Sequence, residues 1–184
     1  MAAPLAVPES VETERLILRA PALSDAQQLF DSYTSDARVT RFLSWQPHAS
    51  IEETEAYLAT CLTRWATAPG SPYFIEMKAS PGKAIGAIEM RCHATRVSFG
   101  FVLSRYYWGQ GLMPEALRAL SDWALRQTQI WRASAACDVE NVASARVMEK
   151  AGMAFEGILR RAVLAPNISS EPRDCRLYAR VRQG

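Results

Sequence analysis

The chain has 184 residues, 49% apolar and 22% charged, which is long enough for one globular domain with its own hydrophobic core. The 21 Lys and Arg residues against 19 Asp and Glu residues leave a net charge of only +2, which is too small to imply a nucleic-acid partner by itself. No apolar run reaches membrane-spanning length. We therefore expect neither a nucleic-acid partner nor a membrane partner.

The N-terminal residues 1–11 are rich in Ala and Pro and predict an arm outside an ordered core of about residues 12–182. The arm lacks the basic residues that open a secretory signal peptide. The four cysteines are scattered, with no spacing suited to a zinc site, and a chain of this size needs no disulfide framework. We therefore expect free thiols, no metal and a cytoplasmic location.

The first elements predicted in the core are a strand and a helix. Residues 14–19 alternate, with Leu16 and Leu18 on one face, as in a strand. Ser24 or Asp25 then caps a helix that is expected to run to about residue 33.

An aromatic connection over residues 40–50 leads to a second helix. Ser50 and Glu53 have the spacing of a capping box, which predicts a helix to about residue 67. Two strands follow at 73–77 and 84–92, joined by a turn at Pro81-Gly82, as in an antiparallel meander.

Glu89 is the polar residue of the 84–92 strand that most needs an explanation, because it shares a face with Ile85 and Ala87. One interpretation is a carboxylate satisfied by an arginine such as Arg91 or Arg96. The other is a general base that acts directly or through water.

The stretch from Ser98 to Arg126 predicts a strand, a tight turn and a helix. Its turn, Trp108-Gly109-Gln110-Gly111, is followed by Pro114 and Glu115, which suit a first helical turn. The free N–H groups of that turn favour a phosphate or pyrophosphate. Neither the dinucleotide fingerprint nor the P-loop fits, because the third glycine position holds Pro114 and Gly-Lys-Ser/Thr is absent.

A small-residue strand at 133–139 precedes the last predicted helix. Asn141 is a good N-cap, Met148 and Ala151 lie on one helical face, and Gly152 is a good C-cap.

Several motifs in this order resemble the Gcn5-related N-acetyltransferase (GNAT) superfamily, and its RimJ/RimL-like ribosomal-protein N-acetyltransferase branch in particular. The resemblance spans about residues 12–182. It is carried by Trp108–Gly111 with Glu115-Ala116, by the Asn-x-x-Ser of 141–144, by Glu-Gly-x-x-Arg at 156–160, and by Asp174 with Tyr178. Trp108 and Met113 depart from the general superfamily loop pattern, whereas Gly111 matches it.

The resemblance implies an α+β fold, with one GNAT domain over residues 1–184. Its central sheet is expected to have seven mostly antiparallel strands flanked by about four helices. The sheet is expected to splay between the fourth strand, about 96–103, and the fifth, about 132–139.

The resemblance also implies acetyl-CoA as the co-substrate. Main chain of 101–103 is expected to align the acetyl group, amides of 110–113 to bind the pyrophosphate, and Asn141 to contact the pantetheine arm. Ser144 is expected near the sulfur as proton donor to the leaving thiolate, or else it only satisfies an amide at the helix start. The expected cofactor-binding residues are Phe101, Val102, Leu103, Trp108, Gly109, Gln110, Gly111, Leu112, Met113, Asn141, Ser144 and Met148, and the expected catalytic residues are Ser144 and Glu89.

The expected acceptor is a primary amine, foremost a protein or peptide N-terminal α-amine that attacks acetyl-CoA directly. Losing a proton at pH 7 costs about 4.6 kcal/mol for a lysine but about 1.1 kcal/mol for an N-terminal amine. The alternatives are a small-molecule amine, or a non-catalytic acyl-CoA-binding module on the same fold. Either a monomer or a homodimer is compatible with the sequence.

Overall fold

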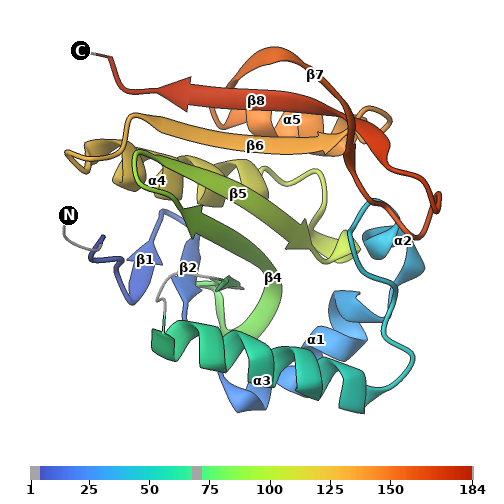
Figure 1. The fold of residues 1–184 in the computed structure, drawn as a ribbon. Helices are drawn as coiled ribbons and strands as arrows, with labels where there is room; N and C mark the ends of the chain where they lie inside the picture. Colours follow the sequence, from blue (N-terminus) through green and yellow to red (C-terminus); the bar gives the residue numbers. More distant parts are fainter. Residues whose placement is uncertain (1–4, 68–71, 184) are drawn as a thin grey trace.

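The computed structural model describes residues 5–67 and 72–183, and within them eight strands form one sheet (Figure 1). The spatial order is β1-β2-β3-β4-β5-β6-β8-β7, and every pairing is antiparallel except that of β5 with β6. The strands are β1 (Ser10–Glu12), β2 (Leu16–Arg19), β3 (Tyr73–Met77), β4 (Ser80–Cys92), β5 (Arg96–Leu103), β6 (Arg132–Asp138), β7 (Ala154–Val163) and β8 (Arg173–Val181).

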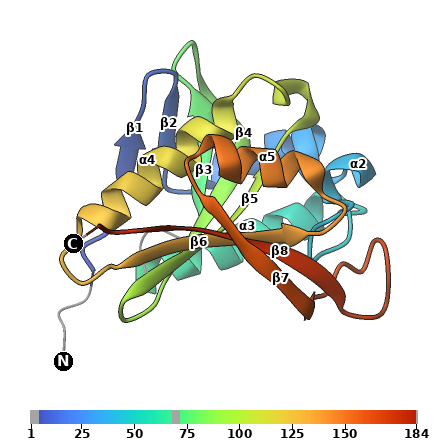
Figure 2. The same ribbon diagram turned by 90° about the horizontal axis from the view of Figure 1, so that it is seen from above.

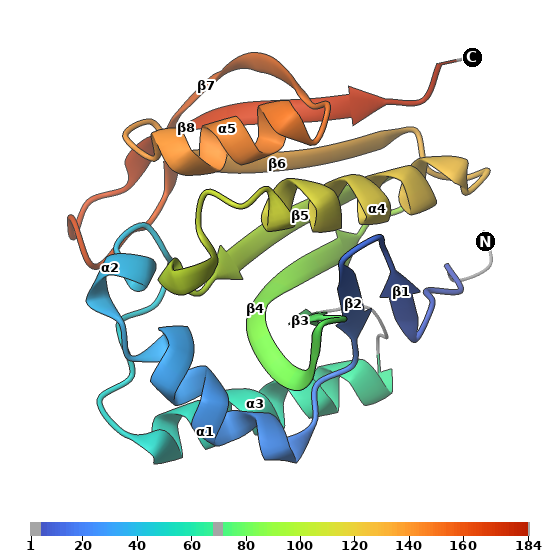
Figure 3. The ribbon, with the colours of Figure 1, turned by 180° about the vertical axis from the view of Figure 1, so that it is seen from behind.

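Helices cover both faces of this sheet. One face carries α4 and α5, which lie in front of the strands in Figure 3, and the other carries α3, with α1 packed against it. The helices are α1 (Ala26–Leu29), α2 (Ala37–Thr40), α3 (Ile51–Thr67), α4 (Leu112–Arg126) and α5 (Val142–Lys150). None of the described helices is both long and apolar enough to cross a bilayer.

Each helical layer has its own hydrophobic cluster. On the α4 side, Leu117 and Leu120, which are three residues apart and so share a helical face, are fully buried against the sheet. On the α3 side, Leu58 packs with Leu29 of α1 and Phe74 of β3. The view from above shows α4 and α5 together on one side of the strands (Figure 2).

The predicted α+β class is confirmed, but the described sheet has eight strands where seven were expected. The additional strand is β1, whose Val11 pairs with Leu18 of β2. It falls at the end of the predicted arm, of which residues 1–4 lie outside the described chain. Val11 and the preceding Leu5 and Val7 are partly buried against the core, so apolar contact holds this segment in place.

Two local predictions differ from the structure. The helix expected over residues 24–33 is divided into a 3₁₀ turn (Leu23–Asp25), α1, and a π-helical turn (Phe30–Thr34). The turn expected at Pro81-Gly82 lies instead at residues 78–79, and Gly82 takes a positive φ of 80° inside β4, opposite register shifts in β3.

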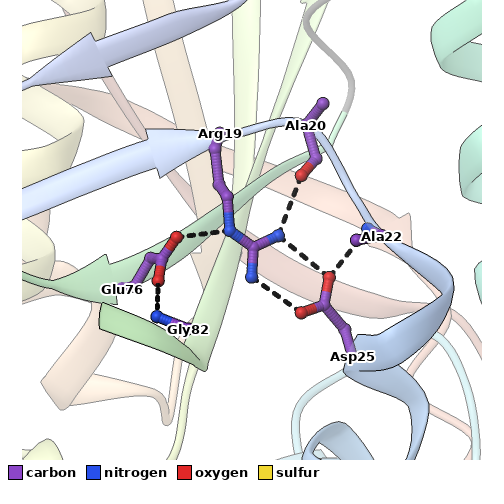
Figure 4. Close-up of polar contacts among 6 residues, drawn as sticks. All are labelled: Arg19, Ala20, Ala22, Asp25, Glu76 and Gly82. Carbon is purple, nitrogen blue, oxygen red and sulfur yellow. Dashed lines mark hydrogen bonds and ion pairs between the residues drawn. The ribbon is translucent and has the colours of Figure 1, made fainter. Parts of the chain in front are cut away.

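Arg19 connects three separate segments at the start of the fold (Figure 4). Its guanidinium donates to both carboxylate oxygens of Asp25, at 2.7 and 2.9 Å, and through Nε to Glu76 of β3. Glu76 in turn accepts from the backbone N–H of Gly82, and Asp25 accepts from that of Ala22 at 2.8 Å. The side chains of Asp25 and Glu76 are only 3% and 8% exposed. One guanidinium thus pairs with two buried carboxylates.

Replacing Arg19 with Ala is expected to lower the free energy of unfolding by about 3–5 kcal/mol, because both carboxylates would remain buried without their cation. Arg19→Lys is expected to recover only part of this loss, since an ammonium cannot make the bidentate contact. Urea unfolding at neutral pH measures both, with Arg126→Ala, an exposed position in the last turn of α4, as the control. Equal stability of Arg19→Ala and Arg126→Ala would contradict this role.

Candidate active site

β5 and β6 run side by side for only half their length, as Figure 1 shows. Their parallel pairing extends from Arg96↔Arg132 to Phe99↔Ala135. Beyond it, β5 stays with β4 as far as Leu103, and β6 stays with β8 as far as Asp138. The predicted splay is therefore present, and two strand edges face each other without pairing.

A cavity of about 680 Å³ opens at this splay, within the size range of small-molecule sites. Its walls come from β4, β5 and β6, from α3 and the connection before it, from the start of α5, and from the end of β7 and the first half of β8. Its lining includes Trp45, Tyr57, Arg64, Glu89, Arg91, Gly100, Phe101, Val102, Cys137, Asp138, Asn141, Ser144 and Cys175.

The open edge of β5 suits an extended ligand that carries amide groups of its own. Backbone N–H and C=O groups in a protein interior require partners, and residues 100–102 line the cavity without a second strand beside them. A pantetheine arm has amides at the spacing of a short peptide and would fit such an edge.

The glycine loop lies just past the end of β5. Gly109 and Gly111 take φ values of 78° and 76°, a region that other residues rarely occupy. Gly111 is the N-cap of α4, and the side chains of Leu112 and Met113 are buried, so the first turn presents backbone rather than side chains. These features fit a phosphate group at the start of α4.

Two side chains of the glycine loop also stabilise it through hydrogen bonds to nearby backbone carbonyls. The indole Nε1 of Trp108 donates to the carbonyl of Leu103 at 2.8 Å, and the amide of Gln110 donates to the carbonyl of Tyr106 at 3.1 Å. The two residues thus fix the loop through contacts inside the protein.

Arg15, in the turn between β1 and β2, supplies a cation beside the loop. Its Nη1 donates to the carbonyl of Gln110 at 3.0 Å, and a Cβ built on Gly111 would lie 3.6 Å from its Nη2. Glu115 holds the guanidinium at 2.7 Å and also accepts from Thr13 at 2.6 Å. Partial burial acts to raise the pKa of Glu115, but these hydrogen bonds outweigh it and lower the pKa. Because Arg15 and Glu115 are 100 residues apart, no local pattern predicts their contact.

The start of α5 forms the facing wall. Asn141 accepts from the backbone N–H of Ser144 at 3.1 Å, as its predicted role as N-cap requires, and both residues line the cavity. Met148 does not line it, because its side chain is fully buried in the core.

Asp138, at the end of β6, was not singled out in the sequence but fixes this wall. Its carboxylate accepts from Arg173 of β8 at 2.5 Å and from the backbone N–H of Glu140 at 2.9 Å. Burial acts to raise the pKa of Asp138, but Arg173 and the Glu140 amide lower it further than burial raises it. Asp138 is therefore an ionised, fully engaged carboxylate that ties β8 to the start of α5.

Glu89 lies in the opposite wall, where its two carboxylate oxygens bond separate arginines, Arg64 of α3 and Arg91 of β4. Burial acts to raise the pKa of Glu89, but the hydrogen bond from Arg64 and the charges of both guanidinium groups hold it below its usual value. The geometry thus favours the arginine-bound interpretation, although Arg64 was not among the expected partners.

The other titratable groups in the wall are also poor bases near pH 7. Burial raises the pKa of Cys137 to about 11 and also raises the pKa of Cys175. Burial raises the pKa of the Tyr57 phenol as well, so it is protonated. Among the described lining residues, no group combines a free lone pair with a pKa near neutrality.

The structure thus gathers most of the expected residues around one cleft. Phe101, Val102, Asn141, Ser144 and Glu89 line the cavity itself. Leu103 and the 108–113 loop continue from its edge, and Met148 stays in the core. Arg15, Arg64 and Asp138 are site residues that sequence reasoning missed.

Comparison with known proteins gives a family match and similar structures. A model of the acetyltransferase (GNAT) domain matches residues 15–154. "Uncharacterized N-acetyltransferase YoaA" of Bacillus subtilis (strain 168) is 26% identical over 175 residues, covering 94% of this chain and 96% of the relative.

Two solved structures share the fold. The microcin C7 self-immunity acetyltransferase MccE, in complex with acetyl-CoA and AMP, gives a TM-score of 0.80 at 20% identity, covering 95% of this chain and 97% of that one. RimL, a ribosomal L7/L12 alpha-N-protein acetyltransferase in complex with coenzyme A, gives 0.77 at 24% identity, covering 94% and 98%.

Proposed function

This chain belongs to the GNAT acetyltransferase family, and from that premise we propose that its acceptor is the α-amine of a protein or peptide N-terminus. The chain is an acetyl-CoA-dependent N-acetyltransferase. The observation that carries the proposed acceptor is the absence of a free base among the described lining residues of the cavity. An α-amine needs no strong base, because about 1.1 kcal/mol deprotonates it at pH 7.

The proposed position of acetyl-CoA uses the open edge and the glycine loop. Main-chain groups of residues 101–103 would pair with the pantetheine arm, and a β5 N–H would stabilise negative charge on the thioester oxygen as the amine attacks. The 110–113 amides and Arg15 would bind the pyrophosphate. These assignments extend the expectation from sequence by one residue, Arg15.

Ser144 is the proposed proton donor to the departing thiolate. It lies in the cavity wall at the start of α5, and its backbone N–H is already bonded to Asn141. The hydroxyl is therefore not required to cap the helix and remains available for chemistry.

The two arginines beside Glu89 would help to keep the acceptor amine neutral. A Cβ built on Gly100 of β5 would lie 3.4 Å from Nη2 of Arg91, so this guanidinium lies directly over the open strand. Arg64, Arg91 and Glu89 together carry a net charge of +1. Positive charge disfavours an ammonium ion and lowers the pKa of a nearby amine.

The RimJ/RimL-like assignment is part of this proposal, and so is a cytoplasmic location. The first is supported by the motifs around Gly111 and Asn141 and by the shared fold of RimL, which is itself an alpha-N-protein acetyltransferase. The second is supported by four cysteines that are all free in the structure.

A small-molecule amine is the second candidate acceptor, and the aromatic part of the cavity wall favours it. Trp45 stacks with Tyr57 at a ring-centroid distance of 6.5 Å, and both line the cavity. A planar acceptor would pack against this pair. MccE, which has the same fold, is described in complex with AMP.

An acceptor panel tests the proposed function directly. Thiol release from acetyl-CoA is followed with N-terminal peptides, matched peptides with an acetylated N-terminus and one internal lysine, and free aromatic amines. We expect kcat/KM for the N-terminal peptides to exceed that for the lysine peptides by about 100-fold or more at pH 7, because of the difference in amine pKa. Preference for a lysine peptide would overturn the proposed acceptor, and preference for a free amine would support the second candidate.

Arg15→Ala is expected to raise KM for acetyl-CoA by about tenfold with little change in kcat, because it removes a cation from the phosphate loop and leaves Glu115 unneutralised there. Steady-state kinetics with acetyl-CoA varied measures the effect. Arg126→Ala, at the other end of α4, is the matched control and should leave KM unchanged. An unchanged KM in Arg15→Ala would show that the phosphates bind elsewhere.

The acid–base assignment predicts different effects for Ser144 and Glu89. Ser144→Ala is expected to lower kcat by about 100-fold without raising KM, because the thiolate would lose its proton donor. Its two arginines hold the pKa of Glu89 below its usual value, so this carboxyl stays ionised near neutral pH and should contribute no limb to the pH–rate profile there. Activity should instead rise with pH until the acceptor amine is deprotonated, at or below about pH 7.8.

The variant Glu89→Gln tests whether Glu89 acts as the general base or only positions the two arginines. We expect the limb of kcat/KM to persist in this variant at the amine pKa, with activity reduced less than that of Ser144→Ala. Loss of the limb together with loss of activity in Glu89→Gln would identify Glu89 as the base.

A further inference from the structure

A second cavity, of about 460 Å³, lies between the α1 segment and the turn that precedes the glycine loop. It shares no lining residue with the cavity at the splayed strands. Its helical wall is a polar stripe at helical spacing, and its other walls come from β4 and residues 104–107. The stripe consists of Ser24, Gln27, Gln28, Asp31 and Ser32.

Two hydroxyl groups at this cavity are buried without a partner. Ser104, at the end of β5, is fully buried, and its Oγ has no hydrogen bond to any residue that the structure describes. The Oγ of Ser32 is likewise buried and unpaired, and both serines line the same cavity. Buried hydroxyls in proteins nearly always have partners, so both serines retain hydrogen-bonding capacity that a ligand in the cavity would satisfy.

The charges around the cavity define that ligand further. Lys83 of β4 lines it and makes no ion pair within the described chain, whereas the carboxylate of Asp31 already accepts from Gln27 at 3.0 Å. The amide of Gln28 supplies a further donor and acceptor. The ammonium group of Lys83 would pair with an anionic group of the ligand. The hydroxyls of Ser32 and Ser104 and the amide of Gln28 would bond to several hydroxyl groups on the same molecule.

We propose that this cavity binds a small polyhydroxylated anion, a sugar acid or a sugar phosphate, with its anionic group at Lys83 and its hydroxyls on Ser32 and Ser104. A molecule of this kind satisfies both buried serines and neutralises the lysine. An apolar wall formed by Ile85 and Tyr107 leaves room for the carbon face of a sugar.

A ligand in this cavity would be coupled to acetyl-CoA through the turn at Arg105–Tyr107. The carbonyl of Ser104 accepts from the N–H of Tyr107 at 3.0 Å, and the carbonyl of Tyr106 accepts from Gln110 in the glycine loop at 3.1 Å. Fixing Ser104 and Tyr106 therefore fixes the loop. Coupling is reciprocal, so acetyl-CoA must alter the affinity of the second ligand by the same factor. The coupling depends on the proposed position of acetyl-CoA, whereas the binding itself does not.

Isothermal titration calorimetry with D-gluconate, glucose 6-phosphate and glucose tests the site. At least one of the two anions is expected to bind, with glucose about tenfold or more weaker. Lys83→Gln should weaken the anion by about tenfold through loss of a charged hydrogen bond. Lys78→Gln removes the same charge from a lysine that pairs with Glu12 outside the cavity, and should bind normally.

Ser32→Ala gives a readout that a purely structural serine would not. It should raise the melting temperature of the free protein, because an unpaired buried hydroxyl is removed, and at the same time weaken anion binding by about fivefold. Absence of binding by both anions, equal binding of glucose, or normal binding by Lys83→Gln would overturn the site.

The coupling is measured separately, as the dissociation constant of acetyl-CoA with and without saturating anion. We expect a change of about fivefold or more. An unchanged dissociation constant of acetyl-CoA would contradict the proposed coupling but not the proposed binding site. Turnover of a different class of amine, with every N-terminal peptide inactive, would overturn the proposed acceptor without bearing on this binding site.

Discussion

The parting of β5 from β6 beyond Phe99 is the constraint on which the site depends. Each strand keeps its outer partner to the end: the N–H of Ser104 still donates to Ile85 of β4, and Asp138 is still paired with Cys175 of β8. The two inner edges therefore cannot close on each other. Unpaired backbone groups in an interior are costly, and a ligand with a peptide-like backbone is the natural partner for them. The fold thus keeps an open hydrogen-bonding edge at the end of a parallel pair.

At each end of the cleft, a glutamate binds an arginine and holds it in place. Arg15 lies beside the glycine loop, bound by Glu115, and Arg91 lies over Gly100, bound by Glu89. Both arginines are half exposed, and ion pairs of such exposure contribute little to stability. Each carboxylate instead holds a guanidinium in one orientation beside the cleft. Arg19 differs, because its partners are buried and it holds the fold itself together.

The features predicted from sequence are those set by local chemistry. The tight turn that ends at Gly111 and the cap made by Asn141 depend on nearby residues, and both are present as predicted. The partner of Glu89 on α3 is 25 residues away, and Arg15 meets Glu115 across 100 residues, so periodicity and spacing carry no trace of either. β1 was missed because it gains its stability from packing on the core rather than from its own three residues. The splay was foreseen only through family resemblance, since no local rule specifies where two parallel strands separate.

The lack of a free base makes protonation of the acceptor part of its selection. At pH 7 the cost of deprotonating a lysine exceeds that of an α-amine by about 3.5 kcal/mol, a factor of roughly 400 in the fraction that is neutral. A neutral lysine amine is the stronger nucleophile, which offsets some of this factor. The net +1 charge of Arg64, Arg91 and Glu89 would lower the pKa of either amine, which favours the neutral α-amine at pH 7 and leaves lysine mostly charged. For the acceptor that we propose, much of the preference for a chain terminus would then need no contact with the rest of the acceptor, and the aromatic pair of Trp45 and Tyr57 would select among termini.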